Sequence, residues 1–312
     1  MSNALAYFLL CRSPLHVGCG ISLGDIDQPV MRNVVTGHPM VPASTLKGCL
    51  KEPALHAWFA NEPRELAERG IKSLFGDEGK DSTGLLCPQD AQLLALPVAS
   101  LAGGWAWVTC PGVLRGLARR LRQCGAAQSA TIPEPRRDDT TKDFALVVGS
   151  DSPLAFDWGG TRRVALAETP LHAQDSTALR KWARWIAGSA HRGEADAEWR
   201  NFVVQRFALV GDEIFDHFCT VATDVRSRNR IGEEGVTDNT ALWREECVPE
   251  HALFYGSISA QAVPSNPRRW SEADALALVG PYSLQFGAKS TIGYGQAEFI
   301  PFDAAAFHAE AP

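Results

Sequence analysis

The sequence predicts a single α+β domain over residues 1–312, and three observations support this fold class. Apolar runs typical of buried strands alternate with stretches of helical periodicity. Long insertions containing glycine and proline separate these segments irregularly, which favours a split βαβ arrangement over a doubly wound parallel sheet. The apolar content of 45% is enough for a substantial core, so one elaborated domain is sufficient.

The N-terminal part of the chain predicts a strand, a long loop and a helix. Leu5–Arg12 is apolar and aromatic and is expected to be the first strand. Residues 13–39 follow as a polar loop with glycine and proline, and loops of this length inside compact domains are often functional. Ser44 is expected to be the N-cap of a helix beginning TLKGCLK, which Pro53 is expected to bend or end.

The middle of the chain predicts further strands and helices around an insertion. Pro111 suits the first turn of a helix that carries Arg115, Arg119 and Arg122 on one face, which is most simply a solvated face and alternatively an RNA contact. Residues 124–175 are expected to form an irregular insertion. The remaining patterns predict strands at 91–96, 105–109 and 202–210, and helices at 175–188 and 212–222.

Residues 223–250 predict a projecting β-hairpin. In VRSRNRI the arginines Arg226, Arg228 and Arg230 recur at every second residue, so a strand would place them on one face. GEEG is the expected turn, and NTALWREE is the returning strand. Such a basic row suits a phosphate backbone, although charge on an edge strand also protects against aggregation.

The C-terminal part predicts a strand at LFYGSISA, a helix at SEADALALVG and a glycine-rich turn leading into a last strand. Within that turn, Gly293 and Gly295 indicate a backbone that approaches something closely, or a tight turn.

Composition excludes several classes of protein. The eight cysteines are scattered without a CxxC pair, so neither a zinc site nor a disulfide framework is indicated. The N-terminus lacks the features of a signal peptide, and no apolar stretch reaches about 18 residues, so we expect a cytoplasmic protein with no membrane partner. The formal net charge of −6 disfavours a protein that coats nucleic acid with its whole surface but allows a local basic groove.

A dinucleotide site is the main rival suggested by the glycines. Gly18, Gly20 and Gly24 form GxGxxxG after a strand, but DIDQPV follows, where a pyrophosphate-binding helix would have to begin. No GxxxxGK[ST] loop occurs in the sequence, so no organic cofactor is expected.

Several segments together resemble one family of nucleic-acid-binding proteins. They are PLHVGCGISLGDIDQPVMRNVVTGHPMVPASTLKGCLK, FGDEGKDSTGLLCPQDAQLLALPVASLAGGWAWVTCPGVL, DVRSRNRI with LWREECVPEHALFY, and FGAKSTIGYG. In this order they resemble the RAMP-superfamily backbone subunits of type III-B CRISPR Cmr effectors, specifically the fourth-subunit family. S-x-LKG with a C-terminal GxG loop is typical of RAMP proteins in general, whereas the Asp-before-proline loop with WVTCP indicates this subunit.

The resemblance implies a fold, partners and an activity. The fold would be a modified RRM-like (ferredoxin-like) palm with an inserted β-hairpin thumb at residues 223–250. Copies of the chain would stack as a filament along guide CRISPR RNA, together with other Cmr subunits. The thumb would separate base pairs between guide and single-stranded target RNA at regular intervals, and Asp27 would cleave the target.

The chemistry expected at Asp27 is modest. RNA carries its own nucleophile in the 2′-hydroxyl, so a site has only to remove that proton, align the attack and stabilise charge. Asp27 is expected either to hold Mg²⁺ or a similar divalent cation or to act as the base, with Asp25 close by. His16 is a candidate acid or base, or a structural residue. The resemblance further suggests that Glu245 and Glu246 complete a site in a neighbouring subunit, unless they belong to a solvated hairpin.

The candidate RNA contacts come from both ends of the chain. Lys47 in TLKG is the foremost, because a helix N-terminus and an ammonium both favour phosphate. The remaining candidates are Ser44, Arg32, Arg226, Arg228, Arg230, Gly293 and Gly295. The leading hypothesis is a metal-dependent endoribonuclease that acts slowly and only in the assembled complex. A non-catalytic RNA-binding scaffold of the same complex is the alternative.

Overall fold

In the computed structural model, the described residues are 4–20, 22, 24–77, 83–127, 131–136, 143–231, 237–263, 270–287 and 289–308, without the side chains of 230, 231, 237–241, 306 and 308. Helices are α1 Ala43–Phe59, α2 Arg64–Phe75, α3 Pro111–Gln123, α4 Thr177–Ala190, α5 Ala197–Gln205, α6 Asp212–Val221 and α7 Glu272–Ala277, with 3₁₀ turns η1 Glu194–Asp196, η2 Ser290–Ile292 and η3 Ala304–His308. Strands are β1 Ala4–Cys11, β2 Met40–Val41, β3 Leu86–Pro88, β4 Ala91–Ser100, β5 Gly104–Thr109, β6 Phe144–Val147, β7 Phe156–Trp158, β8 Thr161–Leu166, β9 Thr169–Asp175, β10 Phe207–Leu209, β11 Asp224–Ile231, β12 Thr237–Cys247, β13 Leu253–Ala260, β14 Tyr282–Gln285 and β15 Gln296–Phe302.

One mixed sheet organises the fold. Its order is β14-β15-β1-β13-β4-β5-β10-β6-β9-β8-β7, with β2 beside β4 and β3 beside β13. The strands from β14 to β5 pair antiparallel, whereas β10 pairs parallel to β5 and β9 parallel to β6. Strand β1 is buried from Ala6 to Cys11, because it lies between β13 and β15 and is covered on its face by helix α3.

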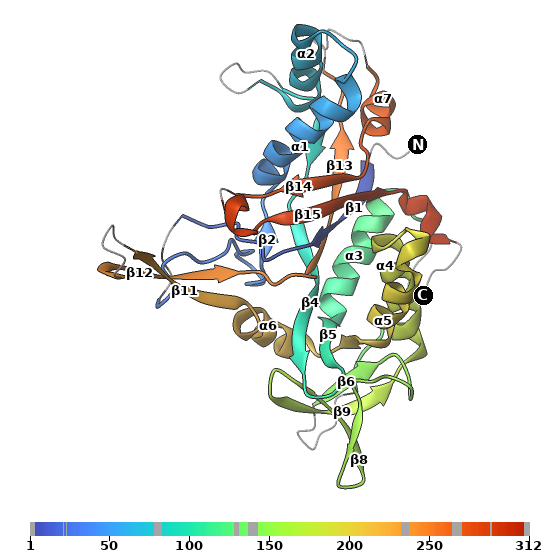
Figure 1. The fold of residues 1–312 in the computed structure, drawn as a ribbon. Helices are drawn as coiled ribbons and strands as arrows, with labels where there is room; N and C mark the ends of the chain where they lie inside the picture. The colour runs from blue at the N-terminus through green and yellow to red at the C-terminus, as the bar shows by residue number, and fades with distance from the viewer. Residues whose placement is uncertain are drawn as a thin grey trace.

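Different helices cover different strands of the sheet (Figure 1). Helix α3 packs across β1, β13 and β4, and α4 packs on β6 and β10, whereas α1 contacts β14 and β3. Helix α3 contacts the sheet through one apolar face that includes Leu114, Leu117 and Leu121, as its periodicity predicts. In the described part of the chain, no helix is long and apolar enough to cross a membrane.

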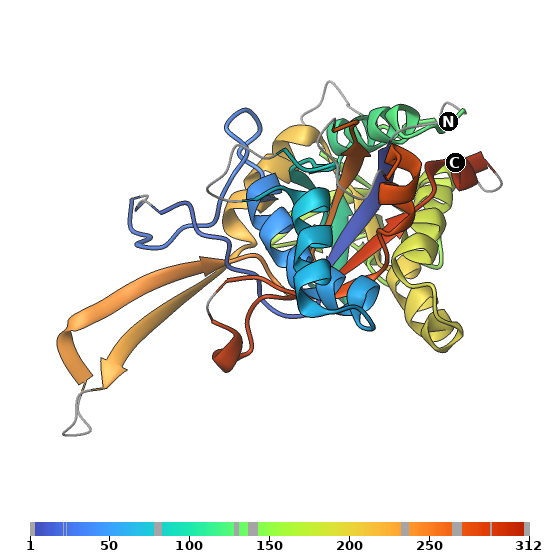
Figure 2. The same ribbon diagram turned by 90° about the horizontal axis from the view of Figure 1, so that it is seen from above.

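The hairpin β11–β12 is separate from the main sheet and projects away from it, as both views show (Figures 1 and 2). Its register pairs Arg226 with Glu245 and Asp224 with Cys247, so the base of β12 runs directly into the core. The GEEG turn expected at its tip lies outside the described residues.

The α+β class is confirmed, but several local expectations are wrong. Residues 124–175 are not simply irregular, since β6, β7, β8 and β9 extend the sheet there. The strand expected at 202–210 is the end of α5 followed by the short β10. Ser44 lies inside the first turn of α1, whose N-cap is Pro42, and Pro53 lies within the helix, which continues to Phe59. In the described part of the segment that follows Gly18, Gly20 and Gly24, no helix begins before α1.

The C-terminal loop contacts the hairpin, and its conformation requires two glycines with left-handed backbone. Gly293 and Gly295 both have φ of 81°. A Cβ at Gly295 would lie 2.0 Å from the Phe286 carbonyl oxygen, whereas a Cβ at Gly293 would meet no atom within 4 Å. The expected close approach of backbone therefore applies to Gly295, and Gly293 needs only its conformation.

This difference predicts unequal costs of substitution. Gly293→Ala should lower the free energy of unfolding by about 1 kcal/mol, the strain of a left-handed alanine. Gly295→Ala should cost at least about 2 kcal/mol, because the methyl group also forces backbone apart. Urea unfolding of both variants checks this, and equal costs would show that the contact at Gly295 is readily relieved.

Candidate functional site

The loop that carries Asp27 is seated on the base of strand β12. The Asp27 and Gln28 amides both donate to the Arg244 carbonyl at 3.1 Å, and the Glu246 amide donates to the Gln28 carbonyl at 3.0 Å. One carboxylate oxygen of Asp27 accepts the Arg244 amide at 2.7 Å. Asp27 is exposed, and no other described residue donates to its carboxylate. The second oxygen of this exposed side chain thus has no donor among the described residues.

Glu246 anchors the same loop through its buried side chain. Its side chain is 2% exposed, and its two oxygens accept the Val30 amide, at 2.9 Å, and the Arg32 guanidinium. Arg32 also donates to the carbonyls of Gly37 and Cys219 at 2.9 Å. The structure thus uses Arg32 and Glu246 to fix the loop inside one chain. Both side chains are thus paired within the chain, and the RNA contact of Arg32 and the part of Glu246 in a neighbour's site stay predictions.

His16, like Asp27, is anchored to the base of strand β12. Its Nδ1 is 2.7 Å from the Glu246 carbonyl oxygen, which can only accept, so Nδ1 carries the hydrogen. The neutral ring then presents Nε2 as a proton acceptor. The two anchors, Arg244 and Glu246, are two residues apart, or about 7 Å along an extended strand. The backbone anchors of His16 and Asp27 therefore lie near each other, and a ring nitrogen of His16 lies within 4.8 Å of ligand atoms of Glu245 and Cys247.

Glu245 points to the other side of β12 and is 1% exposed. Its carboxylate accepts the Lys289 ammonium at 2.6 Å and lies 3.7 Å from Arg228 Nε. Lys289 also donates to the Gln28 side-chain oxygen at 2.9 Å. The alternative of Glu245 on a solvated hairpin is thus wrong, since it lies in a buried network of its own chain. Its part in a neighbour's site stays a prediction.

One group of potential metal ligands occurs here among the described residues. Ligand atoms of His16, Glu245 and Cys247 lie within 4.8 Å of one another. The set does not suit a divalent cation, because Lys289 already neutralises Glu245 and burial raises the pKa of the Cys247 thiol to about 12. A hard cation such as Mg²⁺ prefers oxygen ligands, and the open oxygen of Asp27 is the better candidate.

Two hairpin arginines converge on Tyr294 of the C-terminal loop. The Tyr294 hydroxyl, in a residue 4% exposed, accepts hydrogen bonds from Arg226 at 2.8 Å and Arg228 at 2.5 Å. Both guanidinium carbons lie about 5 Å from the ring centre, at 5.2 and 5.1 Å, and burial raises the pKa of Tyr294. The two arginines share a face, as their spacing predicts, but they are paired within the chain. The side chain of Arg230 lies outside the described residues.

Lys47 lies apart from this cluster, at a hollow of about 280 Å³ between α1 and β3. Its lining also includes Ser44, Gly84 and Cys87. Burial raises the pKa of the Cys87 thiol, and the nearby Lys47 ammonium opposes that shift. Ser44 is exposed and Lys47 half-buried, and no described residue forms an ion pair with Lys47. Its charge remains available for an anion.

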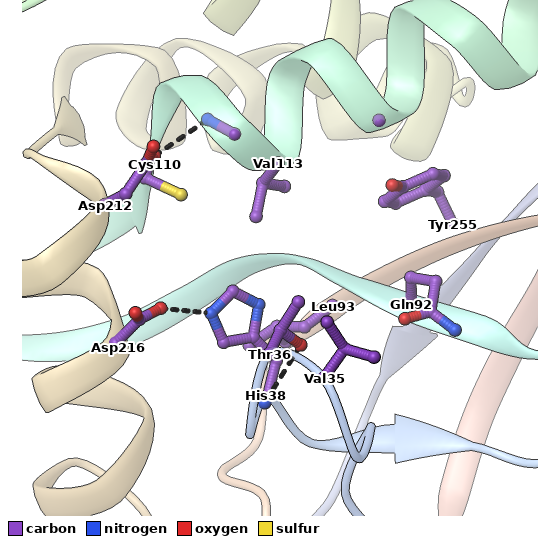
Figure 3. Close-up of a pocket in the computed structure, with 12 residues that line it drawn as sticks. Val35, Thr36, His38, Gln92, Leu93, Cys110, Val113, Asp212, Asp216 and Tyr255 are labelled. Carbon is purple, nitrogen blue, oxygen red and sulfur yellow. Dashed lines mark hydrogen bonds and ion pairs between the residues drawn. The ribbon is translucent and has the colours of Figure 1, made fainter.

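A second hollow, of about 440 Å³, is lined by residues of the 35–38 loop, the start of α3 and helix α6 (Figure 3). His38 Nε2 contacts Asp216 at 2.7 Å, and the Asp212 carboxylate accepts the Gly112 amide at 2.8 Å at the start of α3. These carboxylates make the hollow unfavourable for phosphate, because like charges repel. The sequence patterns did not single out these residues.

Sequence reasoning also missed Gln28, Lys289 and Tyr294. Lys289 and Tyr294 lie in the quoted FGAKSTIGYG segment, so their place in a motif was the available signal. Gln28 could have been found only through its position beside Asp27. Asp25 lies in an exposed turn, and no contact joins it to Asp27 among the described residues.

Comparison with protein families shows that the chain belongs to the RAMP superfamily, whose family model matches residues 8–298. Among curated proteins, it is 28% identical over 290 residues to the CRISPR system Cmr endoribonuclease Cmr4 of Pyrococcus furiosus, covering 91% of this chain and 90% of the relative. Among solved structures, oligomeric Cmr4 from Pyrococcus furiosus matches with a TM-score of 0.68 and 24% identity, over 96% of this chain and 97% of that one. A chain of the type III-B Cmr-beta complex bound to cognate target RNA matches with a TM-score of 0.65 and 19% identity, over 96% of each chain.

The ion pair beneath the loop predicts a large effect of Arg32→Met. The variant leaves the buried Glu246 carboxylate without its cation, which should lower the free energy of unfolding by about 3 kcal/mol. Arg64→Met is the matched control: Arg64 is 91% exposed in a pair with Glu68 on α2, and its loss should cost less than about 0.5 kcal/mol. Urea unfolding of both variants checks this, and similar small costs would show that Glu246 does not need Arg32.

Proposed function

We propose that this chain is a backbone subunit of a type III-B Cmr effector that binds guide RNA and cleaves complementary target RNA at Asp27. The observation that carries the proposal is the Asp27 carboxylate, held by the Arg244 amide through one oxygen and open through the other. The relative named as a Cmr endoribonuclease, alike over nine-tenths of both chains, supports the same reaction.

The residues of the site suit cleavage by the 2′-hydroxyl of RNA. The open oxygen of Asp27 would hold Mg²⁺ or a similar divalent cation, which when bound supplies positive charge for the phosphate. Water and phosphate oxygens would complete the coordination, because this carboxylate is a single protein ligand. His16, with Nδ1 bound to the Glu246 carbonyl, presents Nε2 to accept the proton of the hydroxyl.

The assembly follows from the same proposal. The sheet with its helices would be the RRM-like palm, and β11–β12 the thumb that separates base pairs of guide and target. Arg226 and Arg228 would support the base of this thumb through Tyr294. Stacking of copies along the guide, together with other Cmr subunits, would bring target RNA to each Asp27 at regular spacing. A relative solved as an oligomer supports this arrangement.

A non-catalytic scaffold of the same complex is the second candidate. It is favoured by the hydrogen bond from the Arg244 amide, which gives Asp27 a structural role without any chemistry. Both candidates need guide RNA, so only cleavage separates them.

Asp27→Asn separates the two candidates. The asparagine oxygen can still accept the Arg244 amide, so the loop should keep its position while the charge is removed. In the reconstituted complex, cleavage of guide-complementary RNA should fall by about 100-fold or more, with binding retained. Removal of divalent cations with a chelator should have a similar effect on the wild type.

Asp25→Asn is the matched control, since Asp25 is an exposed carboxylate two residues away. It should leave cleavage close to the wild-type rate. Regular cuts that persist in Asp27→Asn, or a wild type that binds target without cutting it, would support the scaffold.

Lys47→Met tests the guide contact. Losing one phosphate contact should weaken binding of single-stranded guide RNA and reduce the slope of log binding constant against log salt by about 0.7. Lys181→Met on the exposed face of α4 is the control and should leave the slope unchanged. Equal slopes for all three proteins would place the phosphate contact elsewhere.

A further inference from the structure

We propose that Lys289 is a positioning residue for Asp27: it ties the catalytic loop to the buried base of the hairpin through Gln28 and Glu245. The inference rests on the proposed function for its effect on cleavage. The bonds themselves are a property of the folded chain and can be tested without any reaction.

The ammonium of Lys289 joins two segments that are far apart in sequence. It lies 2.6 Å from Glu245 on β12 and 2.9 Å from the side-chain oxygen of Gln28, the residue after Asp27. An ammonium has three hydrogens to donate, so one side chain can serve both acceptors. The Gln28 backbone is bound to Arg244 and Glu246, so Lys289 adds a side-chain contact to the same residue that the hairpin holds.

The segment that carries Lys289 is itself firmly placed. The Tyr294 amide donates to the Lys289 carbonyl at 3.3 Å, and the Gly295 amide donates to the Pro14 carbonyl at 2.9 Å. The Tyr294 ring is buried beneath Arg226 and Arg228. Lys289 therefore extends from a fixed loop, which limits the entropy lost in holding its side chain. Flexible surface lysines lack this support.

Burial gives the contact with Glu245 its strength. A carboxylate that is 1% exposed needs a close partner, and its other cation, Arg228, lies farther away at 3.7 Å. Lys289 is thus held by a strong acceptor on one side and can direct its remaining hydrogens to Gln28. The position of the Gln28 side chain therefore depends on Lys289. The position of Asp27 depends on it in turn, because the two residues are adjacent.

Two other roles would use the same residue differently. Lys289 could serve only to neutralise Glu245, in which case Gln28 is a bystander. Its side chain is 31% exposed, so it could instead contact RNA directly. Positioning predicts a loss of cleavage rate with RNA affinity retained, whereas an RNA contact predicts a loss of affinity.

The experiment uses the full chain in the reconstituted complex. Single-turnover cleavage and target affinity are measured for Lys289→Met, Lys289→Arg, Gln28→Met and the double variants Lys289→Met/Gln28→Met and Lys289→Met/Glu245→Gln. Lys181→Met is the matched control, and urea unfolding reports that each variant is folded. Hydrogen exchange of the Asp27 and Gln28 amides is followed in the full chain without RNA.

Positioning predicts that Lys289→Met and Gln28→Met each slow cleavage by about 10- to 100-fold at unchanged affinity, since small displacements of a reacting group are costly. Their double variant should be no slower than either alone, and Lys289→Arg should recover most of the rate. Lys289→Met/Glu245→Gln should stay slow, and the two amides should exchange faster in Lys289→Met.

Recovery of the rate in Lys289→Met/Glu245→Gln would overturn the inference and leave Lys289 as a neutralising charge. Weakened target affinity would identify an RNA contact instead. Unchanged amide exchange in Lys289→Met would overturn the inference even if the wild type proved unable to cleave, so failure of the positioning role and failure of the nuclease proposal are distinguishable.

Discussion

The buried carboxylate of Glu246 is the constraint on which the site depends. It accepts hydrogen bonds from the Val30 amide and the Arg32 guanidinium, and the backbone carbonyl of Glu246 accepts one from His16. A long loop has little structure of its own, and a charge taken out of water must be compensated fully. One glutamate at the base of β12 thereby specifies where the polypeptide before and after Asp27 must lie.

The Asp27 site has few reactive groups, because the two glutamates at the base of β12 are paired within the chain. Glu245 is paired with Lys289, and Arg226 and Arg228 donate to Tyr294, while the Arg226 side chain stays 42% exposed. At the Asp27 loop, one carboxylate oxygen has no donor among the residues that the structure describes. Such a site has weak chemistry of its own, which agrees with a reaction that depends on how a bound nucleic acid is oriented.

The sequence predicted the elements with strong periodicity and missed those formed by distant partners. Strand β1 and helices α3 and α4 follow directly from apolar patterns, and Asp27, His16 and Lys47 follow from motif and chemistry. Burial of Glu245 and Glu246 could not be predicted, because adjacent charged residues on a hairpin normally face water. Arg32 was similarly assigned to phosphate, since its partner lies more than 200 positions away. Strands β6 to β9 were missed because they are short and show little regular alternation of buried and exposed residues.

The projecting hairpin has a mechanical consequence. Asp27 is hydrogen-bonded to Arg244 through its amide and its carboxylate, so the acidic group is attached to strand β12 at two points. The hairpin is attached at its base to the segment that carries Asp27, and its described part extends from there away from the main sheet (Figure 2). Because the same strand forms the hairpin and holds the acidic group, a displacement of the base of β12 would displace the carboxylate as well.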